Sequence, residues 1–178
     1  SEIGLVIGVE NMTQAPYMLP KARGGYRMGN AEVVDSMLHD ALIDELSGGH
    51  MGVTAENVAK MYGITREECD ELALRSHRLA CKAIDEGKFK EEIVPVEVKM
   101  KKKTILATDD EHPIRDCNME TLSKLRPAFI KDGVVTAANA SGINDAAAAV
   151  VVMSLDKAKE LGVTPLLKMI NICAAEIG

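Results

Sequence analysis

Two apolar, β-branched runs near the two ends of the chain limit the folds that it can adopt. Residues 3–9 read IGLVIGV, and residues 147–153 read AAAVVVM. Unbroken apolar runs of this length are typical of strands that are covered on both faces in a parallel or mixed sheet. Residues 13–143, which lie between the runs, are more polar and more helical. We therefore predict an α/β fold in which core strands bracket an inserted α+β domain.

This pattern divides the chain into three segments. Residues 1–12 and 144–178 are expected to belong to one core, and residues 13–143 are expected to form the inserted domain. A buried strand that starts at residue 3 has no earlier partner strand in the chain. We therefore expect further core strands to come from sequence outside these 178 residues.

Capping signals predict where the helices and strands begin and end. Thr65 and Glu68 match a capping box for a helix that runs to Gly87. Thr54 is the expected N-cap of the preceding helix, which ends at Gly63. The other expected elements are a helix over 31–46, strands over 3–9, 92–100, 104–108 and 147–153, short helices capped by Asn118 and Ser154, and a strand from Pro165 to Ala175.

Composition and charge exclude several classes of function. The formal net charge of −6 disfavours a nucleic-acid partner, because phosphate contacts need a basic surface. No apolar run reaches the roughly 18–20 residues of a membrane-spanning helix, so we expect no membrane partner. The four cysteines have no metal-ligand spacing, so we expect no metal, and they are expected to be reduced thiols in the cytoplasm.

The segment 125–145 changes character several times within a few residues. It reads LRPAFIKDGVVTAANASGIND, with a Lys-Asp-Gly turn followed by a β-branched run and then a loop of small residues. Small side chains leave backbone N–H groups uncovered, so a ligand or another chain can approach closely. An ordinary connecting loop is the alternative that composition alone supports.

Several motifs in order resemble one family. They are ENMTQAPYMLPKARGGYRMGN at 10–30, GGHMGVTAENVAKMYGITREECDELALRSH at 48–77, FKEEIVPVEV at 89–98, and LRPAF, KDG and NASGIND within 125–145. Collinear over essentially the whole chain, they resemble the thiolase family of acetyl-CoA acetyltransferases. The resemblance implies a thiolase-like α/β fold.

The resemblance also implies an acyltransferase that reversibly condenses two acetyl-CoA molecules into acetoacetyl-CoA. Such chemistry uses a cysteine thiolate, an activating histidine and a second cysteine. In the family these groups lie upstream of the strand at 3–9 and downstream of residue 178, so no catalytic residue is assigned and the chain alone is expected to be inactive. Two alternatives stay open: an inactive thiolase fragment that only binds coenzyme A or mediates oligomerisation, and a 3-ketoacyl-CoA thiolase of fatty-acid degradation.

By the same resemblance, the inserted domain holds coenzyme A as part of the substrate, and no further cofactor is expected. Small residues would line the pantetheine tunnel, Phe129 would pack against the coenzyme, and His50 and Met51 would close the acyl end. Apart from the resemblance, His50 is more simply a structural histidine. The predicted binding residues are Leu42, His50, Met51, Ala128, Phe129, Ala137, Ala140 and Ser141.

The long loop at 10–30 contains two prolines and three glycines, and loops of this length are usually functional or packed on a partner. The resemblance implies that it helps to assemble a homo-oligomer, either a dimer or a tetramer. An ordinary surface loop is the alternative. The order His50-Met51-Gly52 resembles the branch of the family that acts on short acyl chains.

Overall fold

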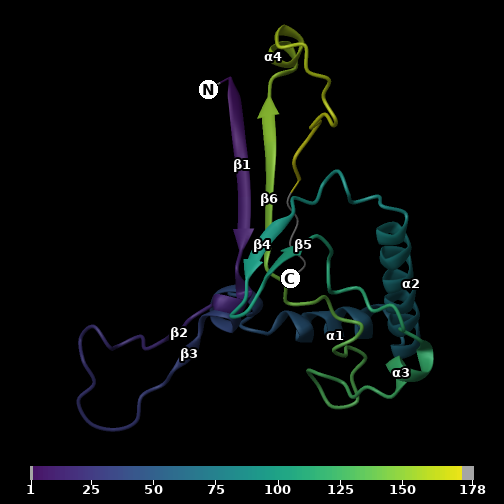
Figure 1. The fold of residues 1–178 in the computed structure, drawn as a ribbon. Helices are drawn as coiled ribbons and strands as arrows, with labels where there is room; N and C mark the ends of the chain where they lie inside the picture. Colours follow the sequence, from purple (N-terminus) through teal and green to yellow (C-terminus); the bar gives the residue numbers. More distant parts are fainter. Residues whose placement is uncertain (1, 174–178) are drawn as a thin grey trace. The chain divides into compact units, whose positions relative to one another are not determined.

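The computed structural model describes residues 2–173, which divide into two compact units (Figure 1). The ribbon unit combines the described residues up to Gln14 with those from Asn144 onward. The helical unit runs from Ala15 to Ile143. The sequence predicted boundaries after residue 12 and after residue 143. The roles assigned to the segments, a thiolase core and an inserted coenzyme A-binding domain, stay a prediction. No helix of the described residues is long and apolar enough to cross a membrane.

Two long strands form the ribbon unit. β1 (Ile3–Glu10) pairs antiparallel with β6 (Ala146–Met153) along its whole length, from Ile3 opposite Met153 to Glu10 opposite Ala146. We expected both strands to be buried in a parallel or mixed sheet. Burial is wrong for the described residues: Val6 is 54% exposed and Val150 is 58% exposed. A two-stranded ribbon has two faces, and within the described part of the ribbon unit no other strand or helix covers either face enough to bury its side chains.

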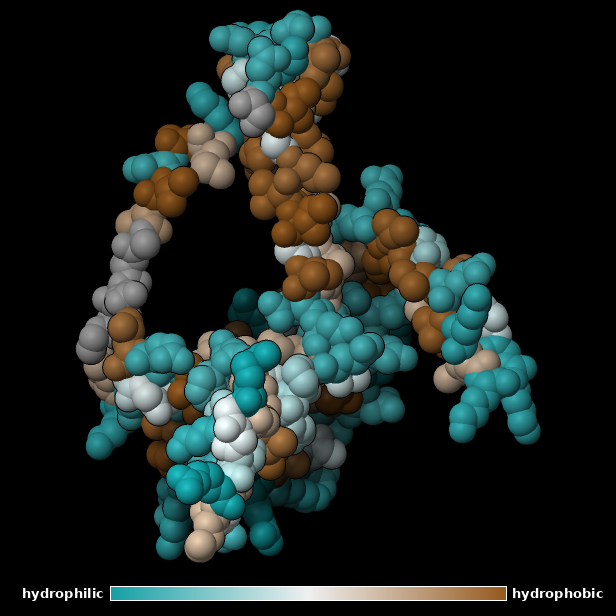
Figure 2. Space-filling view, turned by 90° about the vertical axis from the view of Figure 1, so that its left-hand side faces the viewer, coloured by the Kyte–Doolittle hydropathy of each residue, from teal (hydrophilic) through white to brown (hydrophobic). Residues whose placement is uncertain are grey.

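Apolar side chains therefore gather on the surface of the ribbon, as Figure 2 shows.

A short helix, α4 (Leu155–Glu160), follows β6. Ser154 is its N-cap: the hydroxyl accepts the N–H of Lys157 at 3.1 Å, which confirms the predicted cap. The strand predicted from Pro165 is wrong for residues 165–173, Cys173 included, which form no strand. Its last predicted residues, 174 and 175, lie outside the described part of the chain.

A short hairpin opens the helical unit. β2 (Tyr17–Met18) pairs antiparallel with β3 (Val34–Asp35), and the chain between them forms a long exposed loop. The helix predicted over 31–46 is wrong, because its first part is extended in β3. Asp35 then accepts the N–H of Met37 at 2.9 Å, and helix is confined to residues 36–42, of which Leu38–Leu42 (η2) has π geometry.

Three helices follow, and their termini are well capped. α1 (Met51–Tyr62) begins at His50, whose Nδ1 accepts the N–H of Gly52 at 2.9 Å, so the predicted Thr54 cap is wrong. Gly63 ends α1 with a φ of 65°, a left-handed conformation that glycine adopts without strain, as predicted. In place of Thr54, a histidine performs the capping, because an imidazole nitrogen can accept the same N–H.

The capping box at the start of α2 (Arg66–Asp85) is confirmed. Thr65 accepts the N–H of Glu68, and the Glu68 carboxylate accepts the N–H of Thr65 at 2.7 Å. Asn118 caps α3 (Met119–Ser123) as predicted. The predicted strand pair is also confirmed, with somewhat shorter bounds: β4 (Val96–Lys99) pairs antiparallel with β5 (Thr104–Ala107).

A small apolar core joins α2 to α3. Leu74, Cys117 and Leu122 are buried together, and Met119 and Ala138 pack against them. The Arg66 guanidinium reinforces this junction by donating to the carbonyl oxygens of Leu122 at 2.6 Å and Leu125 at 3.1 Å. The core and Arg66 therefore hold the start of the segment that begins at Leu125 against α2.

Candidate functional site

The N-terminus of α1 carries an aromatic stack. The His50 ring lies with its centroid 4.7 Å from that of Phe129, and the two ring planes are inclined by 34°. Because Nδ1 of His50 accepts the Gly52 N–H, the proton of the neutral ring is on Nε2. Nε2 is therefore the nitrogen that can donate a hydrogen bond to a ligand.

Gly52 allows this stack to form. A Cβ at residue 52 would collide with the Phe129 ring, and the Gly52 position is buried. Only a residue without a side chain lets the ring lie this close to the helix backbone. The predicted residues His50 and Phe129 are thus brought together directly, across Gly52, whose role in packing was not predicted.

One turn further along α1, Glu56 holds the backbone that follows Phe129. Its carboxylate accepts the N–H groups of Val134 and Val135, each at 2.9 Å, and the side chain is 5% exposed. A Cβ at Gly133 would meet this carboxylate, so the chain passes directly over it. Ala128 in turn donates its N–H to the Val135 carbonyl at 2.9 Å, which closes the turn.

A second buried carboxylate, from α2, holds the next part of the segment. Asp70 is 1% exposed and accepts from Arg66 Nε at 2.8 Å and from Asn139 Nδ2 at 2.9 Å. Asn139 also donates to the Val134 carbonyl and accepts the N–H of Thr136. The polar network is complete: among the described residues, every buried side-chain nitrogen and oxygen has a hydrogen-bond partner.

The small residues predicted to line a tunnel follow this network. Ala140 is half-buried and donates to the Thr136 carbonyl at 3.0 Å, whereas Ala137 and Ser141 are exposed. None of the hydrogen bonds or aromatic contacts found among residues 2–173 joins Ser141 to His50. The predicted residues therefore form two groups, the His50–Phe129 stack and the small-residue turn at 137–141. The segment 128–141 contributes to both groups.

The other predicted residues lie around the His50 stack. Leu42 ends η2, and the next residue, Ile43, forms an isolated β-bridge with His50. Met51 is the first residue of α1 and is 54% exposed, and Ala128 is exposed beside Phe129. Met51 and Ala128 are thus exposed, whereas Leu42 is half-buried.

Sequence reasoning missed the contacts that hold the site together, which are made by Glu56, Asp70 and Asn139 and by the packing of Phe129 on Gly52. One signal was present for Glu56. Gly52, Glu56 and Ala59 are buried at four- and three-residue spacing, so a carboxylate interrupts the packed face of α1. A charged residue on a packed face needs partners, and backbone N–H groups supply them here.

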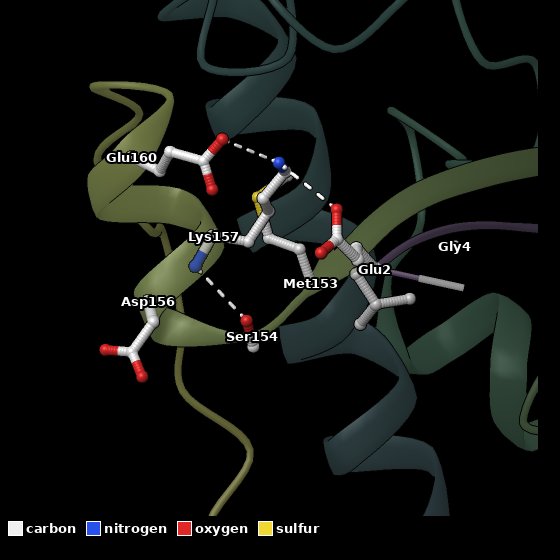
Figure 3. Close-up of a pocket in the computed structure, with 8 residues that line it drawn as sticks. Glu2, Gly4, Met153, Ser154, Asp156, Lys157 and Glu160 are labelled. Atoms are coloured by element: carbon white, nitrogen blue, oxygen red, sulfur yellow. Dashed lines mark hydrogen bonds and ion pairs between the residues drawn. The ribbon is translucent and has the colours of Figure 1, made fainter.

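Two cavities of the structure lie elsewhere and contain none of the predicted residues. The one in the ribbon unit, of about 670 Å³, is lined by Lys157 and by Glu2, Asp156 and Glu160 (Figure 3). Lys157 is paired with Glu2 at 3.2 Å and with Glu160 at 2.8 Å, so its charge is already neutralised. The remaining negative charge disfavours the phosphates of a nucleotide. A smaller cavity of about 320 Å³ in the helical unit is lined in part by Ile84, Phe89, Asp109 and Asp110.

Three of the four cysteines lie in the helical unit and are buried or half-buried, whereas Cys173 is exposed. Cys69 and Cys81 lie on α2, and Cys117 is buried in the loop before α3. Burial raises the pKa of the Cys69 and Cys117 thiols, which lowers the fraction of reactive thiolate. Within residues 2–173, no group of three or more His, Cys, Asp or Glu side chains could hold a metal ion.

Comparison with known proteins gives consistent matches. The family model "Thiolase, N-terminal domain" matches residues 1–156. The acetyl-CoA acetyltransferase of Syntrophomonas wolfei is 51% identical over 99% of the chain and 45% of the relative, and that of Escherichia coli K12 is 55% identical over 91% and 41%. The chain thus spans less than half the length of these curated relatives.

Solved structures match closely as well. A structure of acetyl-CoA acetyltransferase from Syntrophomonas wolfei superposes with a TM-score of 0.91 and 60% identity, covering 97% of this chain and 43% of that one. The crystal structure of human mitochondrial 3-ketoacyl-CoA thiolase gives a TM-score of 0.85 and 42% identity, covering 93% and 42%.

Proposed function

Because the chain belongs to the thiolase family, we propose that it supplies the coenzyme A-binding part of an acetyl-CoA acetyltransferase. The thiolase-like α/β fold expected from the sequence is confirmed. The reaction is the reversible condensation of two acetyl-CoA molecules into acetoacetyl-CoA and free coenzyme A. One observation carries the proposal. The segment 128–141 contains both Phe129 of the aromatic stack and the small-residue turn, and hydrogen bonds from α1 and α2 hold it in place.

The chemistry of these surfaces suits a pantetheine thioester. Pantetheine is a narrow chain with methyl and amide groups, so it needs small residues beside it and apolar side chains for its methyl groups. Ala137, Ala140 and Ser141 supply the first, and Met51 and Phe129 supply the second. We propose that His50 Nε2 donates a hydrogen bond near the acyl end and that Leu42 makes apolar contact with the adenine.

The bond-forming groups are proposed to lie in other parts of the protein. A thiolase needs a thiolate to carry the acyl group, a histidine to activate it, and a second cysteine as acid and base. The raised pKa of the Cys69 and Cys117 thiols makes these two poor nucleophiles. The chain would therefore bind the substrate, and catalysis would require the missing groups.

The short-chain subtype is supported by sequence identity and by His50. Identity is 60% to the acetyl-CoA acetyltransferase structure and 42% to the 3-ketoacyl-CoA thiolase structure. An imidazole at residue 50 narrows the acyl end. A long-chain degradative thiolase is the second candidate. Thiolysis rates for 3-ketoacyl-CoA substrates of increasing length distinguish the two, because a short-chain enzyme loses activity beyond acetoacetyl-CoA.

We further propose a cytoplasmic homo-oligomer, either a dimer or a tetramer. The loop between β2 and β3 exposes Met28 and Tyr26, and the neighbouring Tyr17 is 69% exposed, which suits a loop that packs on another subunit. All four cysteines are free thiols, as in a reducing compartment. Light scattering of the whole gene product should give a mass of two or four subunits, and a monomer would contradict the proposal.

The decisive experiment combines a thiolysis assay on the whole gene product with calorimetric titration of coenzyme A. Ser141→Tyr should abolish binding without changing the melting temperature, because it adds a ring at an exposed position beside the proposed pantetheine path. Ser76→Tyr, at an exposed position on α2, is the matched control. Binding without turnover would favour the module that only binds coenzyme A, and unchanged affinity in Ser141→Tyr would rule out the proposed site.

A further inference from the structure

We infer that Glu56 is a positioning residue for the coenzyme A site: its carboxylate aligns the segment 128–141 along α1, so that the Phe129 stack and the Ser141 turn face the substrate together. This inference rests on the proposed function. Glu56 would touch neither substrate nor catalytic groups and would act through the backbone that it holds.

The hydrogen-bond geometry requires a group with two acceptors. Glu56 presents one oxygen to the N–H of Val134 and the other to the N–H of Val135, both at 2.9 Å. A carboxylate is the side-chain group that accepts at both oxygens and donates at neither. Because the side chain is 5% exposed, water cannot replace a lost bond easily.

The position of Glu56 on α1 links this clamp to the aromatic stack. Gly52 and Glu56 are four residues apart, so they lie on the same face of the helix. Phe129 contacts the first, and Val134 and Val135 bind the second. Two contacts along one helix face fix the segment in register, whereas either contact alone would allow it to slide or rotate.

The turn between these two contacts is tightly constrained. Asp132 has a φ of 60°, a left-handed conformation that costs energy for a residue other than glycine. Gly133 donates to the Ile130 carbonyl at 3.3 Å and lies where a Cβ would meet the Glu56 carboxylate. The chain thus adopts a strained turn directly over Glu56, which indicates that the carboxylate stabilises this conformation.

Downstream, the same backbone leads into the turn that carries Ser141. Val134 binds Glu56 through its N–H and Asn139 through its carbonyl, so α1 and the Asp70 network meet at one residue. A displacement of Val134 would therefore move both groups of predicted binding residues. The hydrogen bonds of Asp70 to Asn139 and of Arg66 to Leu122 do not involve Glu56. They would continue to hold the segment on α2, so such a displacement need not unfold the chain.

The test compares Glu56→Gln with Glu71→Gln in the whole gene product. Glutamine keeps the size of the side chain but turns one acceptor into an NH₂ donor that opposes a backbone N–H. We expect the Kd for coenzyme A and the KM for its thioesters to rise about tenfold, with kcat nearly unchanged, since a charged acceptor is lost from a binding segment. Glu71, exposed on α2, is the control and should leave both constants unchanged.

Gly133→Ala provides an independent variant, because it displaces the same backbone and keeps the carboxylate. Both variants should raise KM in the same way. A fall in kcat and melting temperature with KM unchanged would show a role in folding alone and overturn the inference. Wild-type constants in Glu56→Gln would also overturn it. If the wild-type protein neither binds coenzyme A nor turns over its thioesters, the proposed function itself fails.

Discussion

The ring of Phe129 occupies the space that a side chain on Gly52 would need. The two residues are 77 positions apart (129 minus 52), and their contact fixes the central segment at the N-terminus of α1. The same contact brings the ring to 4.7 Å from His50, centroid to centroid. The proposed acyl end of the site thus depends on the absence of one methyl group.

Gly52→Ala should therefore disturb the site more than its size suggests. The added Cβ would push the Phe129 ring away and separate it from His50, because a crowded contact is relieved by moving the ring. We expect a loss of about 1–3 kcal/mol in the free energy of unfolding, reduced by up to about 1 kcal/mol because alanine favours helix. Urea unfolding and coenzyme A titration measure the two effects.

Gly49→Ala is the matched control for this prediction. A Cβ there would meet only the Ser47 hydroxyl at 3.4 Å, an ordinary van der Waals contact. Its stability and its affinity for coenzyme A should stay close to those of the wild type. Equal effects of the two substitutions would show that the Phe129 contact does not hold the site.

Removing the buried carboxylate of Asp70 should be more costly. Asp70→Ala removes one hydrogen-bond acceptor from Arg66 Nε and one from the Asn139 amide, at a position that is 1% exposed. We expect a loss of about 3 kcal/mol in the free energy of unfolding, near the lower end for a broken buried pair, because Arg66 keeps its two carbonyl partners. Urea unfolding measures it, with Asp156→Ala at an exposed position of α4 as the control.

Stability should also fall in acid through the capping box of α2. The backbone N–H and hydroxyl of Thr65 hold the pKa of the Glu68 carboxyl below its usual value. A carboxyl whose pKa is lower in the folded state stabilises that state above the unfolded pKa of about 4.3, and the stabilisation is lost as the pH falls through the folded pKa. Backbone hydrogen bonds lower the pKa of Asp145 in the same direction.

Glu68→Gln tests this assignment, because a glutamine cannot titrate. The variant should lose less helical stability than the wild type between about pH 6 and pH 3, measured by urea unfolding followed by circular dichroism. Glu67→Gln, in the same helical turn, should follow the wild-type pH dependence. Parallel profiles for Glu68→Gln and the wild type would contradict the role of this carboxylate.

Local signals predicted several elements of the fold correctly, and their successes share one cause. The capping box at Thr65 and the caps at Asn118 and Ser154 depend on neighbouring residues alone, so the sequence displays them. The expected helix over 31–46 was wrong because Val34 and Asp35 pair with a strand almost twenty residues earlier. Such distant pairing overrides helical periodicity.

The sequence predicted residues of the candidate site, but it did not predict the buried carboxylates that hold them in position. His50 and Phe129 were identified by resemblance, and the structure brings them together. Glu56 and Asp70 bind groups about seventy to eighty positions away, and no local spacing reveals such a contact. A buried carboxylate on an otherwise packed helix face is the nearest thing to a sequence signal for them.

The exposed ribbon gives the last prediction. β1 and β6 carry apolar side chains on both faces, a composition typical of strands covered by other layers, and the chain spans less than half of its curated relatives. The 178-residue chain produced alone should therefore bind a hydrophobic dye and self-associate through this ribbon. Val6→Lys should reduce both effects, because a charge at a 54% exposed strand position opposes edge and face association.

Val163→Lys, at a 51% exposed position outside the ribbon, is the control and should change neither dye binding nor self-association. Equal dye binding and equal association in all three proteins would show that the ribbon is not the surface responsible.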